Sequence, residues 1–232
     1  MPLTKYFSDF ISTLIYPHNC CGCGHHLPDT GQVLCWQCVS ELPLTGFENQ
    51  SDNLIEQVFA GRMPVQRATS LLFFVKESLT QQLLHQLKYR GRQDVGIYLG
   101  KHIGRCLQGA GWEIDCIVPL PLNRKKMAKR GFNQAEVLAN GISEVMNKPV
   151  EKVAVIRTKN NPTQTRKNRV ERWQNVSEVF DLQSGYTLQN KHILLVDDVL
   201  TTGATLEACG QVLLQITGAR LSIATAAFAS KI

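Results

Sequence analysis

Two adjacent carboxylates after an apolar run form the most chemically suggestive stretch of the chain. Asp197 and Asp198 directly follow Ile193 to Val196, a run with the pattern of a parallel strand that is buried on both faces. Open α/β sheets bind ligands at the carboxyl ends of their strands, so we expect both carboxylates to face a ligand there. The alternative is a strand that ends in solvated aspartates, followed by a threonine that caps a helix.

A turn rich in threonine and glycine follows the carboxylates and leads into a segment with helical spacing. Backbone N–H groups at a helix N-terminus can hold a phosphate. Gly203 would let the backbone approach a ligand closely, and the threonine hydroxyls add hydrogen-bond donors. A phosphate at the turn, with hydroxyls or a metal ion at the carboxylates, indicates a sugar phosphate. The expected binding residues are Asp197, Asp198, Thr201, Thr202, Gly203, Ala204 and Thr205.

Four of the eight cysteines form two Cys-x-x-Cys pairs with eleven residues between them. Two such pairs can hold one tetrahedral Zn²⁺ through four thiolates, and a site closed in this way has no open position for catalysis. Disulfides are disfavoured in a cytosolic chain, and a redox pair would not need a second pair. We therefore expect a structural zinc ion bound by Cys20, Cys23, Cys35 and Cys38.

Nearby side chains offer other ligand sets for the same metal. Cys21 could replace Cys20 in a tighter Cys-x-Cys arrangement, although the longer spacing is favoured. His18, His25 and His26 lie close enough in the sequence to substitute for a thiolate. Four cysteines already close the site, so these residues are not needed.

Basic residues are concentrated in two short segments. Of the 25 lysines and arginines in this chain of net charge +6, eleven lie between residues 124 and 130 or between 157 and 172. Such clusters favour polyanions, either pyrophosphate or nucleic acid. The first segment follows a strand end and a proline-containing loop. The second lies in a long polar stretch, 157–176, of the kind that is usually functional or disordered. The alternative is a solvated charged face.

The length and composition indicate one moderate domain with an accessory module. The chain has 232 residues, 44% of them hydrophobic, and it contains no apolar run of 18 or more residues and no clear secretory signal. We expect a cytoplasmic protein that is not bound to membranes. The expected strands are 68–75, 114–119, 153–156, 193–196 and 220–228, and the expected helices are 78–88, 94–108, 130–146 and 206–217.

The carboxylate turn resembles a loop found in a known enzyme class. The stretch from Val196 to Thr205 is similar to the phosphoribosyl-pyrophosphate (PRPP) loop of type I phosphoribosyltransferases. The resemblance implies that Asp197 and Asp198 hold the ribose hydroxyls and that Thr201 to Thr205 cradle the 5′-phosphate. It also implies Mg²⁺ as the companion of PRPP.

Further landmarks make the whole chain resemble the ComF (ComFC/GntX-like) family of competence proteins. Those landmarks are the two cysteine pairs, Leu87-Lys88-Tyr89-Arg90-Gly91, Val118-Pro119-Leu120-Pro121-Leu122, Arg130-Gly131-Phe132-Asn133-Gln134-Ala135, and the 192–205 stretch. Lys167 and the Glu178-Val179 pair depart from the family pattern. The resemblance implies a type I phosphoribosyltransferase fold with an N-terminal four-cysteine zinc ribbon.

This fold implies a division of the chain and a set of pyrophosphate-binding residues. We expect a zinc-ribbon module at 1–45, a linker and helical hood at 46–110, and a phosphoribosyltransferase-like α/β domain at 111–232. A cationic lid over the pyrophosphate would exclude water and stabilise charge. Candidates for contacts with the pyrophosphate are Arg124, Lys125, Arg130, Arg157, Gln164 and Arg172.

Two functions remain open from the sequence. The first is a PRPP-binding protein that acts in natural competence and handles imported single-stranded DNA, with competence or recombination proteins as partners. The second is an active phosphoribosyltransferase that transfers ribose 5-phosphate to an unidentified base or nucleotide. Few aromatic residues lie near the basic segments, only Phe132 and Trp173, so base stacking has weak support. The sequence does not indicate the oligomeric state.

Overall fold

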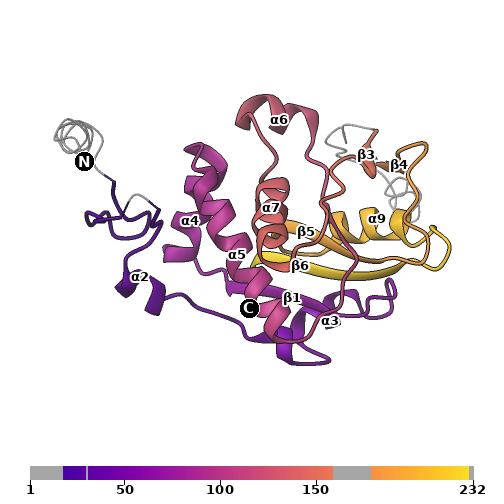
Figure 1. Ribbon diagram of the computed structural model, residues 1–232, viewed down its shortest axis with the longest axis horizontal. Helices are drawn as coiled ribbons and strands as arrows, with labels where there is room; N and C mark the ends of the chain where they lie inside the picture. Colours follow the sequence, from indigo (N-terminus) through magenta and orange to yellow (C-terminus); the bar gives the residue numbers. More distant parts are fainter. Residues whose placement is uncertain (1–17, 30, 159–178, 230–232) are drawn as a thin grey trace, which may run out of the picture.

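A sheet of four parallel strands forms the centre of the molecule. The structure is a computed structural model, and it describes residues 18–29, 31–158 and 179–229. The strands lie in the order β1-β6-β5-β2, with every neighbouring pair parallel. Their bounds are β1 Ala68–Phe73, β2 Cys116–Pro119, β5 His192–Leu200 and β6 Arg220–Phe228. This arrangement is the parallel α/β core expected from the sequence (Figure 1).

Helices cover both faces of this sheet. Their bounds are α2 Trp36–Ser40, α3 Leu54–Phe59, α4 Leu79–Tyr89, α5 Gln93–Gly109, α6 Arg124–Arg130, α7 Gln134–Met146 and α9 Ala204–Leu213, with a short 3-10 helix, η1, at Phe47–Asn49. Helices α4, α5 and α7 share one hydrophobic cluster with Leu194 and Val196 of β5. Helices α3 and α9 share another with Ile193 and Leu195. Alternate residues of β5 therefore enter opposite cores, as the unbroken apolar run predicts.

Helices α5 and α7 cross at close range beside the sheet. A β-carbon on Gly100 would lie 2.2 Å from the carbonyl oxygen of Leu138, and one on Gly141 would lie 2.4 Å from that of Ile97. Only glycine allows the two backbones to approach this closely. The crossing fixes α7, whose N-terminus lies beside the ligand cleft described below.

The sheet crosses the domain boundary that we placed at residue 110. Strand β1 comes from the range expected to form a linker and hood, yet it pairs with β6 along its length, from Ala68 opposite Ile223 to Phe73 opposite Phe228. Helix α5, from the same range, packs on the sheet in the core that also holds α7. The α/β unit therefore includes residues on both sides of that boundary.

Three further elements differ from the sequence prediction. Strand β5 continues past Val196 to Leu200 because β6 continues beside it and supplies hydrogen-bonding partners. Strand β3 (Val155–Arg157) pairs antiparallel with β4 (Phe180–Leu182) in a separate two-stranded sheet. The cationic segment after β2 forms a separate helix, α6, which was not among the expected helices.

Local capping explains why α6 forms. The Asn123 side chain accepts a hydrogen bond from the Lys125 N–H at 2.9 Å, which begins the helix. Gly131 ends it in the left-handed region, with φ 79°. In the described part of the chain, no helix is long and apolar enough to span a lipid bilayer.

Candidate functional site

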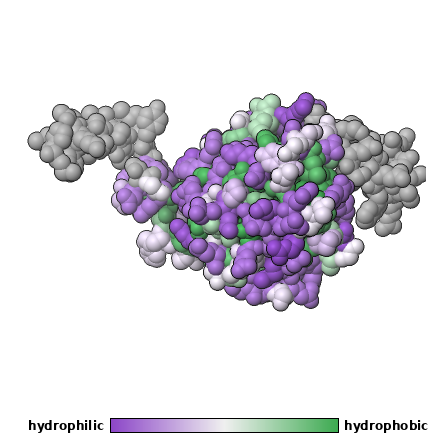
Figure 2. All heavy atoms as spheres, turned by 45° about the vertical axis from the view of Figure 1, so that its right-hand side comes forward, coloured by the Kyte–Doolittle hydropathy of each residue, from purple (hydrophilic) through white to green (hydrophobic). Residues whose placement is uncertain are grey.

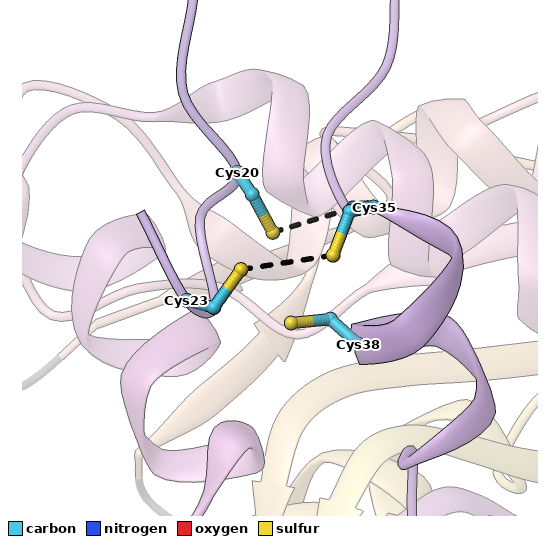
Figure 3. Close-up of side chains that lie close together, drawn as sticks. All are labelled: Cys20, Cys23, Cys35 and Cys38. Atoms are coloured by element: carbon cyan, nitrogen blue, oxygen red, sulfur yellow. Dashed lines mark hydrogen bonds between the residues drawn. The ribbon is translucent and has the colours of Figure 1, made fainter. Parts of the chain in front are cut away.

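The four cysteines of the two pairs converge on one point in the N-terminal module. Their sulfur atoms all lie within 4.8 Å of one another, and the four side chains point toward a common centre (Figure 3). The Sγ atoms of Cys23 and Cys35 are 3.6 Å apart. Sulfurs around a tetrahedral zinc ion would be about 3.8 Å apart, given Zn–S bonds of about 2.3 Å. The cluster therefore has the ligand set and the spacing of a structural metal site such as a zinc ribbon.

The first cysteine pair lies in a tight turn that explains the choice of ligand. The Gly24 N–H donates to the Cys20 carbonyl at 3.0 Å, and Gly24 has φ 75°. In this turn Cys20 belongs to the cluster, whereas Cys21 is buried outside it. The Cys-x-x-Cys spacing thus prevails over the tighter alternative. None of His18, His25 and His26 is in the cluster.

Electrostatics in this module also favour a cation. Burial opposes ionisation of Cys20, but N–H groups of Cys35, Cys23 and Gly22 outweigh it and lower the pKa of Cys20 to about 6. Burial and hydrogen bonds with neighbouring thiols raise the pKa of Cys38. Four clustered sulfurs cannot all carry negative charge unless a metal ion compensates.

The two predicted carboxylates lie near the end of β5, at the carboxyl edge of the sheet. Asp197 pairs in register with Thr225 of β6, and its Oδ1 accepts a hydrogen bond from the Asp198 N–H at 2.8 Å. Both residues are half-buried. Burial, and then the neighbouring Asp198 carboxylate, raise the pKa of Asp197 to about 8, while Lys88 and Lys126 act in the opposite direction.

The turn after β5 opens helix α9 as the sequence predicts. Gly203 is the N-cap residue and has φ 74°, a conformation that favours glycine. No described side chain caps this end of the helix, so its first N–H groups remain available to a phosphate. A small pocket at this turn is lined by the predicted residues Asp197, Thr201, Thr202, Gly203, Ala204 and Thr205.

An arginine that we did not predict holds this turn from outside. Arg62 follows α3, and its Nη1 donates to the carbonyl oxygens of Thr202 and Val58, each at 2.9 Å. Its Nε donates to Oε2 of Glu207 at 3.0 Å, and its Nη2 forms an ion pair with the same oxygen. Glu207 lies in the first turn of α9, so Arg62 connects α3, the turn and the helix.

A larger cleft of about 340 Å³ adjoins the turn formed by residues 201–205, which we call the phosphate turn after the ligand group expected there. Asp197, Asp198, Thr201 and Thr205 line one part of it. The other part is cationic, and its basic residues come from three elements of the fold, α4, α6 and β3: Lys88, Lys126, Arg130 and Arg157. Carboxylates, a helix N-terminus and several cations around one cleft suit a sugar that carries phosphate groups at both ends.

The structure brings only some of the predicted pyrophosphate-binding residues to this cleft. Arg130 and Arg157 line it, Arg130 with its Nη1 bonded to Oε1 of Gln134 at 2.6 Å. Arg124 and Lys125 are exposed and are not among the lining residues. Gln164 and Arg172, most of the predicted lid and Trp173 lie outside the described residues.

Lys88 and Lys126 line the cleft although we did not predict them as site residues. Lys126 lies next to Lys125 in the sequence, but its position one residue further along α6 turns it toward the cleft. Lys88 belongs to α4, and its Nζ lies 3.1 Å from Oδ2 of Asp198. The sequence signal that could have identified Lys88 is its place in Leu87-Lys88-Tyr89-Arg90-Gly91, one of the landmarks of the family resemblance.

An exposed aromatic residue also lies beside α6. The Tyr89 ring, which is 54% exposed, has Arg130 Cζ 5.5 Å and Lys129 Nζ 6.0 Å from its centroid. Figure 2 shows hydrophilic residues beside weakly hydrophobic ones at the top of the molecule, where α6 lies in Figure 1. An aromatic ring therefore accompanies these cations, which the sequence spacing did not reveal.

Residues 127–232 match the family model described as the phosphoribosyl transferase domain. This match, with the parallel sheet and the carboxylate turn at its edge, shows that the chain carries a phosphoribosyltransferase domain of the type I α/β fold. The N-terminal four-cysteine cluster is consistent with the predicted zinc ribbon.

The relatives of the chain include proteins of DNA utilization and competence. It is 31% identical over 138 residues to the DNA utilization protein YhgH of Escherichia coli, covering 57% of this chain and 60% of that protein. It is 35% identical over 100 residues to the competence protein ComFC of Bacillus subtilis, covering 43% and 38%. The match thus spans less than two thirds of either relative. The predicted relationship to ComF proteins is confirmed as distant homology.

A solved structure with some likeness is the glutamine PRPP amidotransferase of B. subtilis. The identity is 19% and the TM-score 0.40, over 60% of this chain and 30% of that one.

Proposed function

We propose that the chain binds PRPP, with Mg²⁺, in the cleft between the phosphate turn and α6. The observation that supports this most directly is the arrangement of Asp197 and Asp198 between an uncapped helix N-terminus and a group of cations. The 5′-phosphate would lie at the Gly203 turn, the ribose hydroxyls at the two carboxylates, and the diphosphate among the cations.

The donor set of the cleft fits a magnesium ion that arrives with the diphosphate. Mg²⁺ prefers oxygen ligands and is usually held by one or two carboxylates together with substrate phosphates. Among the described residues, Asp197 and Asp198 are the acidic side chains that line the cleft. Bound Mg²⁺ would neutralise part of the diphosphate charge, while the chain supplies the carboxylates that position it.

Calorimetry with PRPP and Mg²⁺ tests this proposal. The wild-type protein should bind PRPP, and Asp198→Asn should weaken binding because it replaces a charged acceptor of the ribose hydroxyls. Glu144→Gln is the matched control: it removes an exposed carboxylate that pairs with Lys101 outside the cleft. The absence of heat with the wild-type protein would reject the site assignment.

We further propose that the protein acts in DNA uptake and in the handling of imported single-stranded DNA, in the cytoplasm. The support is the charge on α6 that faces away from the cleft, together with the names of the relatives. Lys125 and Lys129 lie four residues apart, on one side of α6, and neither lines the cleft. Neither forms an ion pair within the described residues. With Tyr89 they could hold phosphates and stack a base.

Binding of a labelled single-stranded oligonucleotide over a range of salt concentrations tests the DNA role. Lys125→Gln/Lys129→Gln should weaken binding and reduce its salt dependence. The control, Lys101→Gln/Lys152→Gln, removes the same charge from two lysines that are paired with Glu144 and Glu136. Equal effects of both double variants would show that net charge matters and α6 does not.

The alternative is an active transferase that moves ribose 5-phosphate to an unidentified base or nucleotide. The cations around the cleft favour it, because they would stabilise a departing pyrophosphate. Release of pyrophosphate in the presence of PRPP and a panel of bases and nucleotides is the measurement. If PRPP stays intact throughout the panel, binding without transfer is the better account.

A further inference from the structure

Lys88 and Asp198 form an ion pair inside the proposed PRPP cleft. The distance from Lys88 Nζ to Asp198 Oδ2 is 3.1 Å, and the two side chains are only 19% and 14% exposed. Lys88 lies in the last turn of α4, and Asp198 lies near the end of β5. A contact between two elements so distant in the sequence ties α4 to the edge of the sheet where the ligand would bind.

The other cations of the cleft are placed differently. Arg130 donates to Gln134, the Arg157 guanidinium lies 5.2 Å from the centroid of the Phe180 ring, and Lys126 is exposed. Among the described residues, Lys88 alone forms an ion pair with a carboxylate of the cleft. The same carboxylate is needed for the ribose hydroxyls in the proposed function.

The Lys88 side chain is largely shielded from water, so its ammonium group is destabilised if it loses one partner without gaining another. Removing one partner of a buried charge pair is strongly unfavourable, because the remaining charge stays desolvated and unpaired. When a sugar engages Asp198, the ammonium of Lys88 therefore needs a new anion within reach of its flexible side chain. The diphosphate of PRPP would occupy the same cleft and supply that anion.

We propose that Lys88 is a pyrophosphate-binding residue, which Asp198 holds in the free protein and releases when the ribose binds. The inference rests on the proposed function and adds a ligand-binding residue from α4, an element outside the region that matches the domain model. In this proposal the partner of Lys88, in the last turn of α4, depends on whether the sugar is bound.

Substitution of Lys88 should affect the pyrophosphate end of the ligand and the ribose 5-phosphate end differently. Lys88→Met should weaken binding of PRPP and of pyrophosphate with Mg²⁺ by about tenfold or more, the effect of losing a charge-assisted hydrogen bond. Binding of ribose 5-phosphate, which has no pyrophosphate to pair with Lys88, should instead become stronger, because the sugar no longer has to separate Asp198 from an ammonium group. Lys88→Arg keeps the charge and should retain most of the affinity for pyrophosphate.

The exchange of Lys88 from Asp198 to pyrophosphate should also change the affinity for pyrophosphate when Asp198 is substituted. Measured without Mg²⁺, Asp198→Asn should strengthen the binding of pyrophosphate, because Lys88 no longer has to leave a carboxylate. The general effect of removing a negative charge is measured by the same substitution in the Lys88→Met background. The gain in the wild-type background should exceed the gain in that control.

Calorimetry with PRPP, pyrophosphate and ribose 5-phosphate on these variants decides the matter. Equal loss for all three ligands in Lys88→Met would show a structural role and overturn the proposal. So would unchanged pyrophosphate binding in Lys88→Met, or an equal gain from Asp198→Asn in both backgrounds. A wild-type protein that binds neither PRPP nor ribose 5-phosphate would instead overturn the proposed function, and this inference with it.

Discussion

Arg62 and Glu207, 145 residues apart in the sequence, form an ion pair beneath the turn that would hold the phosphate. The Arg62 side chain does not line the cleft. Its guanidinium donates a hydrogen bond to the Thr202 carbonyl within the turn. Glu207 has a side chain that is only 10% exposed, so it depends on Arg62 as its partner. The shape of the phosphate turn is thus fixed by a residue that follows α3.

Arg62→Met tests how much this contact stabilises the turn. The substitution leaves the Glu207 carboxylate unpaired, and we expect a loss of about 1–3 kcal/mol in the free energy of unfolding. Ribose 5-phosphate should also bind several-fold more weakly. Chemical denaturation and calorimetry measure the two effects. Lys101→Met breaks an exposed pair with Glu144 and should cost less than about 1 kcal/mol. Equal costs for both variants would contradict the prediction.

Gly203→Ala should damage the turn in two ways. A residue with a side chain is strained at φ 74°, by about 1–2 kcal/mol. A β-carbon at this position would also lie 2.8 Å from Val58 Cγ1 and 3.0 Å from Phe59 Cε1. The second effect should add about 1–3 kcal/mol of overpacking and weaken phosphate binding.

Gly185→Ala is the matched control for the backbone term. Gly185 has φ 86°, and nothing lies within 4 Å of a β-carbon placed there. The difference in unfolding free energy between the two variants isolates the contact with α3. If Gly203→Ala costs no more than Gly185→Ala, α3 does not constrain the turn.

The four-cysteine cluster predicts one zinc ion per chain. Cys23→Ser should abolish stoichiometric zinc and lower the unfolding temperature of the protein, because structural zinc contributes directly to folding. Cys21→Ser should retain the metal, since Cys21 lies outside the cluster. Elemental analysis of the purified variants gives the answer. Cys20→Ser should also lose the metal, and retention of zinc by Cys20→Ser together with loss by Cys21→Ser would favour the tighter ligand set.

Local sequence patterns were sufficient for the metal cluster and the phosphate turn. Within each cysteine pair and within the turn, the functional groups lie only a few residues apart, so local spacing constrains their geometry. The apolar run before Asp197 likewise predicted a buried strand, because its residues alternate between two cores.

Residues joined only by the tertiary fold were not predictable in this way. Lys88, Arg62 and Tyr89 reach their positions because α4 and the segment after α3 pack at the edge of the sheet. No periodicity in the sequence records which cation faces a carboxylate across such a contact. Arg124 and Lys125 show the converse: the positive charge was recognised, but the helical geometry of α6 places both outside the lining of the cleft.

The raised pKa of Asp197 predicts a specific dependence of stability on pH. An aspartate that titrates near 3.9 in the unfolded chain and at about 8 in the folded protein binds more protons when folded between these values. The free energy of unfolding should therefore fall as the pH rises from about 4 to about 8. Asp197→Asn cannot lose a proton, so this contribution should disappear. The groups that set the shift, after burial itself, are Asp198, Lys88 and Lys126.

Urea denaturation at several pH values, without ligand or Mg²⁺, measures this contribution. The wild-type protein should lose stability relative to Asp197→Asn as the pH increases, and the two curves should converge at the acidic end. Asp181→Asn, an exposed aspartate of β4, is the control and should follow the wild type. Parallel curves for the wild type and Asp197→Asn would mean that Lys88 and Lys126 offset the cost of burying the charged carboxylate.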